Sequence, residues 1–181
     1  FNSSWEQAKP AGLLMDAAAD GEFCWITNAT GLPNRGENSW LESPCFDFSG
    51  IGIPVMRFAL RHQLSSRMLA RMELNRGQGW ERLGDVFSHG SEGWYDGQAP
   101  QHAPLSGPVW TGSERIAWSQ VVFMMPEYTA ESSIRFAPFG NPFGLKVRLD
   151  RFDGGPDLLR VRRVLHGVRG HRRPHRNSAP N

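Results

Sequence analysis

The residues of this chain that could perform catalysis are few, and the densest group lies in residues 38–50, NSWLESPCFDFSG. This stretch contains two carboxylates, Glu42 and Asp47, and one of the two cysteines, Cys45. Paired carboxylates can act as a general acid and a general base, and a thiolate can act as a nucleophile. The residue types alone therefore permit either kind of active site, and the local structure has to decide.

The same stretch also has the pattern of a β-strand interrupted by a bulge. In an extended chain, alternate side chains point to opposite faces, so Leu41 and the cysteine share one face. Pro44 has no N–H to donate to a neighbouring strand, which indicates a sheet edge or a bulge. A bulge shifts the phase, so that Phe46 and Phe48 join Leu41 in the core. On this interpretation both carboxylates face solvent, the cysteine is a core residue or half of a disulfide, and the stretch carries no chemistry.

The sequence lacks the common motifs of enzymes. The segment HGSEG around Ser91 departs by one position from the Gly-x-Ser-x-Gly elbow of hydrolases. His171 and His175 have the i,i+4 spacing of a helical metal site, but Pro174 lies between them and no acidic residue is near. No glycine-rich phosphate loop follows an expected strand. We therefore predict that the chain is not an enzyme, although carboxylates on distant strands, as in glycosidases, would escape such a search.

Three residues beside loops could hold a hard cation. Asp16, Glu37 and Asn38 offer the oxygen ligands that Ca²⁺ prefers, so they are the candidate ligands of a structural calcium ion. The sequence contains no EF-hand loop, and solvated loop side chains are the alternative. No other cofactor is predicted.

Aromatic residues form a second set of candidates. Trp94, Tyr95 and Trp110 flank the longest irregular stretch, residues 88–108. Because aromatic faces stack on sugars and anchor protein interfaces, these three are the candidate ligand-binding residues. The alternative is that the rings pin this loop to the body of the domain. Trp118 lies in an apolar run and is expected in the core.

The two cysteines leave two alternatives open. Cys24 and Cys45 lie in strand-like segments on either side of a turn-rich loop at residues 28–38. A cross-strand disulfide between them is geometrically feasible, and two separate buried thiols are the alternative.

Period-two alternation predicts the elements that must position these residues. Apolar and polar residues alternate in residues 55–62, 68–75 and 145–150 and again around Arg135, as in strands with one face in a core and one in water. Residues 115–124 are apolar on both faces and indicate a central strand. Glycine and proline punctuate these runs, and helical periodicity is weak throughout. The predicted fold class is all-β, an antiparallel β-sandwich of jelly-roll type.

Charge is distributed unevenly along the 181 residues. From Arg160 onward there are seven arginines and no acidic residue, whereas residues 1–159 carry 13 basic and 18 acidic residues. The body is mildly acidic, so binding of nucleic acid would depend on the tail alone and ranks last among the functions considered. The tail has no apolar periodicity and is predicted to be disordered. No run of 18 or more apolar residues occurs, so no membrane span is predicted.

Short blocks of the sequence also follow a known order of strand signatures. They include an opening strand, a Ser-Pro strand, a hairpin in which Trp80 closes a Gly-rich turn, and a penultimate strand around Phe136. In order they are SSWEQAKPAG, GEFCWITNATG, SWLESPCFDFSG, PVMRFALRH, MELNRGQGWERLGD, IAWSQVVFMMP and SIRFAPFG. Together they resemble the MAM-like jelly-roll modules of secreted bacterial proteins, which are kin to the MAM adhesion domains of animal receptors. The resemblance covers about residues 3–145.

The resemblance implies a non-catalytic extracellular module, secreted or at the cell surface, that mediates adhesion or recognition as part of a multidomain chain. Its partner would be an extracellular protein. The alternative is a carbohydrate-binding accessory domain that uses the loop aromatics to bind a glycan. Residues 144–157 depart from the Gly-Phe-Ala-Ile-Asp-Asp strand that closes the family, which indicates a change of reading frame near residue 140. The predicted organisation is a MAM-like β-sandwich domain at residues 1–157 and a basic tail at residues 158–181.

Overall fold

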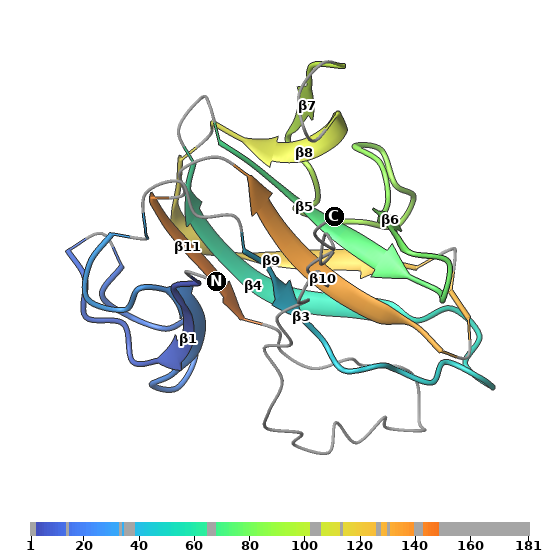
Figure 1. The fold of residues 1–181 in the computed structure, drawn as a ribbon, viewed down its shortest axis with the longest axis horizontal. Coiled ribbons are helices and arrows are strands. Elements are labelled where there is room, and N and C mark those ends of the chain that lie inside the picture. The colour runs from blue at the N-terminus through green and yellow to red at the C-terminus, as the bar shows by residue number, and fades with distance from the viewer. Residues whose placement is uncertain are drawn as a thin grey trace, which may run out of the picture.

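Two antiparallel sheets lie one on the other in this protein (Figure 1). The structure is a computed structural model that describes residues 3–13, 15–32, 34, 39–64, 68–101, 106–112, 114–125, 128–129, 131–139 and 143–148. Every strand pair is antiparallel, and no helix occurs among the described residues. The prediction of an all-β antiparallel sandwich is confirmed, whereas its jelly-roll connectivity stays a prediction. The predicted tail at residues 158–181 lies outside the described residues.

The first sheet has five strands in the order β1-β2-β11-β4-β9. Its strands are β1 (Trp5–Ala8), β2 (Cys24–Thr27), β11 (Phe143–Arg148), β4 (Val55–Gln63) and β9 (Glu114–Met124). The last strand in sequence, β11, therefore lies between two early strands, β2 and β4. The strand predicted at residues 145–150 is confirmed up to residue 148, and the rest of that range is outside the described residues.

The second sheet has the strand order β3-β10-β5-β8-β7, and a sixth strand, β6, also pairs with β5. Its strands are β3 (Leu41–Glu42), β10 (Ser133–Phe139), β5 (Leu69–Asn75), β8 (Gly107–Thr111), β7 (Gly97–Ala99) and β6 (Trp80–Arg82). Strand β10 occupies one edge of β5 over its whole length. The other edge of β5 is shared, because β8 pairs with Leu69 and Ala70 while β6 pairs with residues 73–75. In Figure 1, β5 and β10 cross in front of β4 and β9.

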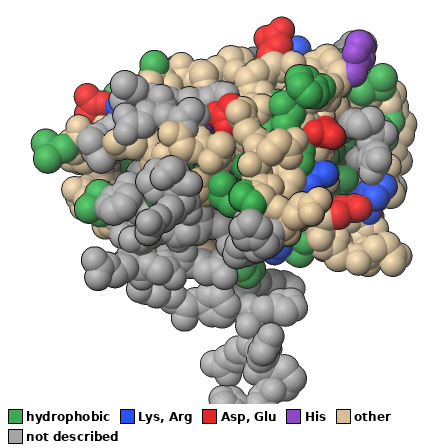
Figure 2. Space-filling view, turned by 90° about the horizontal axis from the view of Figure 1, so that it is seen from above, with side chains coloured by type: hydrophobic (Ala, Val, Ile, Leu, Met, Phe, Trp, Pro, Cys, Tyr) green, Lys and Arg blue, Asp and Glu red, His purple; other side chains and the backbone are tan. Residues whose placement is uncertain are grey.

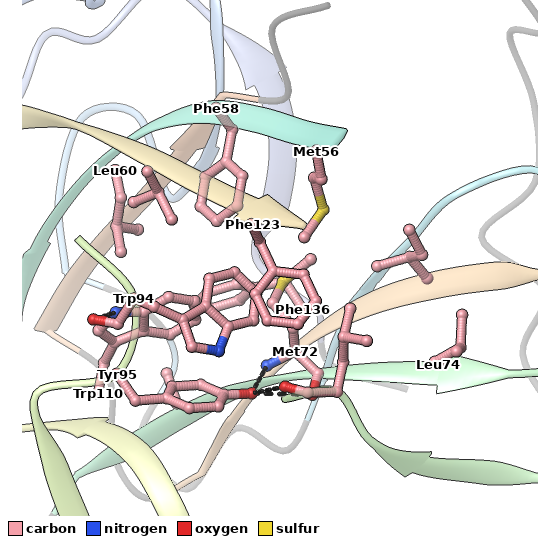
Figure 3. Close-up of a cluster of buried hydrophobic side chains, with 14 of the residues drawn as sticks. Met56, Phe58, Leu60, Met72, Leu74, Trp94, Tyr95, Trp110, Phe123 and Phe136 are labelled. Atoms are coloured by element: carbon pink, nitrogen blue, oxygen red, sulfur yellow. Dashed lines mark hydrogen bonds between the residues drawn. The ribbon is translucent and has the colours of Figure 1, made fainter. Parts of the chain in front are cut away.

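The core lies between the two sheets and is built from alternate residues of their strands. Met56, Phe58 and Leu60 of β4 are fully buried, and Met72 and Leu74 of β5 are buried opposite them. Figure 3 shows these side chains in the space between β4 and β5. The alternation predicted for both strands is therefore confirmed, because one apolar face per strand is what a two-layer sandwich buries.

The bulge predicted at Pro44 is present beside β3. Glu42 is opposite Arg135 and Phe46 is opposite Ser132, so this strand has one more residue than β10 over the same interval. The extra residue shifts the phase as expected, since Phe46 and Phe48 are buried while Glu42 and Asp47 are exposed. Cys45 is exposed as well, so its predicted place in the core is wrong.

Strand β9 differs from the sequence prediction of a central strand. It ends the strand order of the five-stranded sheet, with β4 as its partner and one isolated bridge, from Val122 to Glu92, at its other edge. A loop, and not a strand, covers part of its outward apolar surface. Trp118, for example, is half-buried against the segment before β2, and its indole N–H donates to the carbonyl of Ala17 at 3.1 Å.

A glycine is required where the chain enters the core after β6. Gly84 has a φ of +77°, and a Cβ at this position would lie 2.5 Å from the ring of Phe123 and 2.8 Å from Nε1 of Trp94. Those two rings stack on each other with centroids 4.1 Å apart, so neither can move aside freely. The close approach of this backbone to the rings therefore leaves no room for a side chain.

We predict that Gly84→Ala lowers the free energy of unfolding by about 2–4 kcal/mol, since overpacking adds to the cost of a left-handed backbone. Gly50→Ala is the matched control, because Gly50 has a φ of +78° and no atom within 4 Å of an added Cβ. It should cost about 1 kcal/mol, the backbone part alone. Urea unfolding of both variants measures the difference, and equal losses would contradict the steric argument.

Candidate functional site

The three aromatic residues predicted to bind a ligand are instead core residues. Trp94, Tyr95 and Trp110 are 4%, 4% and 0% exposed, and they lie together between the sheets (Figure 3). Trp94 stacks on Phe123, and Trp110 stacks on Phe136 with ring centroids 5.6 Å apart. The rings therefore pin the segment before β7 to the body, which is the alternative that the sequence left open, and they offer no open face to a ligand.

The hydroxyl of Tyr95 ties this segment to the neighbouring sheet. Its oxygen accepts a hydrogen bond from the backbone N–H of Met72 at 3.0 Å, and its proton faces the carbonyls of Leu83 and Met72 at 2.9 and 3.1 Å. Burial raises the pKa of Tyr95 far above its usual value, so the phenol stays protonated. A protonated, fully engaged phenol has a structural role and is not available for catalysis.

The predicted calcium ligands are not gathered by the described part of the structure. Asp16 is exposed and lies 3.3 Å from Nη1 of Arg61, across the outer face of the five-stranded sheet. Glu37 and Asn38 are outside the described residues. Within the described ranges, no group of three or more His, Cys, Asp or Glu side chains could hold a metal ion.

No disulfide joins the two cysteines, although both are described. Cys24 is buried in a small cluster with Met15, Ile26 and Ala29 on the outer side of the five-stranded sheet. Cys45 follows β3 in the other sheet and is exposed. The physical reason for the separation is that Cys24 belongs to the five-stranded sheet, whereas Cys45 follows a strand of the six-stranded sheet.

A row of charged side chains crosses the outer face of the six-stranded sheet. None of these residues was among the predicted site residues. Strand register places Glu42 of β3 opposite Arg135 of β10, Arg135 opposite Glu73 of β5, and Glu73 opposite Arg82 of β6. Residues directly opposite each other in paired strands share a face, so these four form one line with alternating sign. We call this line the charged row.

Glu73 is the anchor of the charged row because it is a carboxylate with almost no contact with water. Its side chain is 3% exposed. One carboxylate oxygen accepts hydrogen bonds from Nε and Nη2 of Arg71, at 2.8 and 2.5 Å, and the other oxygen accepts one from Nε of Arg135. Both arginine side chains are 18% exposed. Charge-assisted bonds to two guanidinium groups are what such a buried carboxylate requires.

Two indoles enclose Arg135 on the same face. Its guanidinium carbon lies 4.8 Å from the ring centroid of Trp40 and 4.4 Å from that of Trp80. Trp40 precedes β3, Trp80 begins β6 and Arg135 belongs to β10. Three residues from separate parts of the sequence therefore meet on the outer face of this sheet. Both indoles are half-buried, and the N–H of Trp40 donates to Glu42 at 3.3 Å. We call Trp40, Arg135 and Trp80 the indole–arginine stack.

The sequence contains a weak signal for this surface. Alternation assigns Arg71, Glu73 and Arg135 to the solvent side of their strands, and Trp80 appears as the residue that closes a Gly-rich turn. These signals do not show that the residues meet, because register between distant strands is set by the whole sheet and not by local pattern. Sequence reasoning therefore missed the cluster.

Exposed apolar residues are scattered by comparison. Among the residues that the structure describes, the five large ones that are more than half exposed come from separate segments: Leu13, Phe23, Leu32, Ile53 and Phe87. On the face drawn in Figure 2, hydrophobic side chains are interspersed with charges of both signs. Single exposed apolar residues are normal on protein surfaces, so they mark no site by themselves.

Comparison with known proteins adds no relative: no protein family, no curated protein and no solved structure matches this chain. Across the described residues, no helix has the length and apolar character needed to cross a membrane. Function therefore has to be argued from the indole–arginine stack and the charged row.

We predict that Glu73→Gln lowers the free energy of unfolding by about 3–5 kcal/mol, because two mostly buried guanidinium groups lose their counter-ion. Glu81→Gln is the matched control, since the Glu81 carboxylate pairs with Arg76 but is 48% exposed. That change should cost about 0–1 kcal/mol. Chemical denaturation of both variants provides the measurement, and a Glu73→Gln loss as small as the control would show that the buried network carries little energy.

We predict that Tyr95→Phe costs about 1–3 kcal/mol, because the variant leaves buried backbone groups of Met72 and Leu83 without their partner. Tyr128→Phe serves for comparison, since the hydroxyl of the half-buried Tyr128 donates to the carbonyl of Ile51 at 3.0 Å. It should cost less, because water can replace that partner. Thermal unfolding compares the two, and an unaltered melting temperature for Tyr95→Phe would be inconsistent with its anchoring role.

Proposed function

We propose that this chain is a non-catalytic protein-interaction or adhesion module, of the MAM-like jelly-roll class, that acts outside the cell as part of a multidomain protein. The contact surface in this proposal is the outer face of the six-stranded sheet around the indole–arginine stack. The order of strand signatures supports the class, and the enclosed arginine supports the surface. The supporting observation for the surface is that Arg135 lies between Trp40 and Trp80 above the buried Glu73.

Such an arrangement has the properties of an interface hot spot. Tryptophan and arginine are the residue types most enriched among the few side chains that dominate binding energy between proteins. Here their conformations are fixed before any partner arrives, because Arg135 is held by a carboxylate below and by two rings beside it. A surface that is ordered in advance loses less conformational entropy on binding.

The carbohydrate-binding alternative has less support. Its predicted platform, Trp94, Tyr95 and Trp110, is buried. In the indole–arginine stack, Trp40 and Trp80 each have one face occupied by the guanidinium of Arg135. Sugars bind to the open faces of aromatic rings, so a protein partner, which can also use ring edges and charged groups, suits this surface better.

We predict that Trp80→Ala reduces capture of the partner by at least about tenfold, because truncation of a hot-spot indole costs 2 kcal/mol or more. Beads carrying the domain are incubated with labelled surface proteins from the cells that make it, and bound label is quantified. Arg57→Ala is the control, since Arg57 is exposed on β4 in the other sheet. Circular dichroism checks that Trp80→Ala and Arg57→Ala are folded. Equal capture by folded Trp80→Ala and by the original chain would refute the proposed surface. Glycan-array binding that survives Trp80→Ala would do the same.

A further inference from the structure

We propose that a second copy of this chain binds the outer face of the six-stranded sheet, in a symmetric face-to-face pair. This inference rests on the proposed use of that face and adds the identity of the partner. It is carried by the sign pattern of the charged row, which reads minus, plus, minus, plus from β3 to β6 in Glu42, Arg135, Glu73 and Arg82. Read in the opposite direction, the same row has the opposite sign at every position.

The two ends of the charged row are accessible, while its middle is not. Glu42 and Arg82 are exposed, whereas Arg135 and Glu73 are 18% and 3% exposed and bonded to each other. Arg82 donates from Nε to the carbonyl of Gly84 at 3.2 Å and from Nη1 to the carbonyl of Ser106 at 3.5 Å, so its Nη2 is the group that can donate to a partner. A second molecule therefore meets an exposed carboxylate on one side of the face and an exposed guanidinium on the other.

Symmetry selects one orientation for two such faces. A closed pair of identical chains has a two-fold axis, and two faces can meet only if that axis lies in the plane of contact. An axis parallel to the strands, between β10 and β5, reverses the order of the row. Glu42 of one copy then faces Arg82 of the second copy, and Arg135 faces Glu73. An axis perpendicular to the strands keeps the order and places each charge opposite its own kind.

The pattern therefore favours the parallel axis and disfavours the perpendicular one, since like charges placed together cost several kcal/mol in an interface. The parallel axis also gives the aligned packing that two sheets usually adopt when they meet face to face. The half-buried rings of the indole–arginine stack lie beside the row and provide apolar surface for the contact. In this arrangement the rings contribute affinity, and the outer charges specify how the copies are oriented.

The test is a charge reversal at each end of the row, in the full chain. We expect the original chain to show a concentration-dependent dimer in sedimentation equilibrium. Glu42→Arg and Arg82→Glu alone should each weaken the dimer by at least about tenfold, because each places two like-charged pairs in the interface. An equimolar mixture of the two variants should recover association, since every pair is again opposite in sign. Glu22→Arg, an equal charge change on an exposed residue before β2, should leave dimerisation unaltered.

The outcomes separate this inference from the proposed function. An original chain that stays monomeric at all concentrations, or a mixture of the two variants that fails to associate, overturns the symmetric pair. If the chain is monomeric while Trp80→Ala still abolishes capture from the surface proteins, the proposed function stands with another partner. If the mixture associates, the pair is supported, and weakening of the original dimer by Trp80→Ala then shows that the indole–arginine stack is part of it.

Discussion

The two sheets are joined by aromatic rings from a segment that has almost no regular structure. Trp94 and Tyr95 leave that segment together and enter the space between the layers, where they meet Phe123 from one sheet and Trp110 from the other. The contact with Phe123 depends on the glycine at position 84, since a side chain there would displace both rings. This packing fixes the separation of the sheets and, through the phenol of Tyr95, the position of β5 relative to the chain that leaves β6.

One consequence is that Trp94, Tyr95 and Trp110, the residues predicted to bind a ligand, are buried in the core. Four large aromatic side chains of this cluster, from three separate segments, form a continuous group of rings with little contact with water. In the proposed function, recognition then depends on the outside of the sheet that these rings support. Strands β10 and β5 are held from below by Phe136 and Met72, so their outward residues, Arg135 and Glu73, occupy fixed positions. The internal packing and the external surface are thus two sides of the same strands.

The elements of this fold could be predicted from local pattern, but the surface could not. Met56, Phe58 and Leu60 alternate with polar residues, and that alternation has one physical explanation, a strand with one buried face. The bulge at Pro44 could be predicted for a similar reason, because proline cannot donate to a ladder. By contrast, Trp94 lies in a segment without periodicity, so nothing local distinguishes a buried ring from an exposed one. The edge position of β9 was missed because a loop, and not a strand, covers part of its outward apolar surface.

The charged row required information that only the assembled sheet contains. Glu42, Glu73, Arg82 and Arg135 come from four strands, and each pairing depends on the register of a partner far away in sequence. The buried middle of the charged row loses hydration free energy when the sheet forms. For this reason a buried ion pair is often no more stabilising than apolar residues of similar volume. Apolar residues at these positions could pack against one another on the outer face. They would not hold a guanidinium between two indoles, and they would not give the face the alternating charges that distinguish its β3 end from its β6 end. Under the proposed function, the burial of Glu73 is therefore better explained by the orientation of the proposed contact than by the stability of the fold.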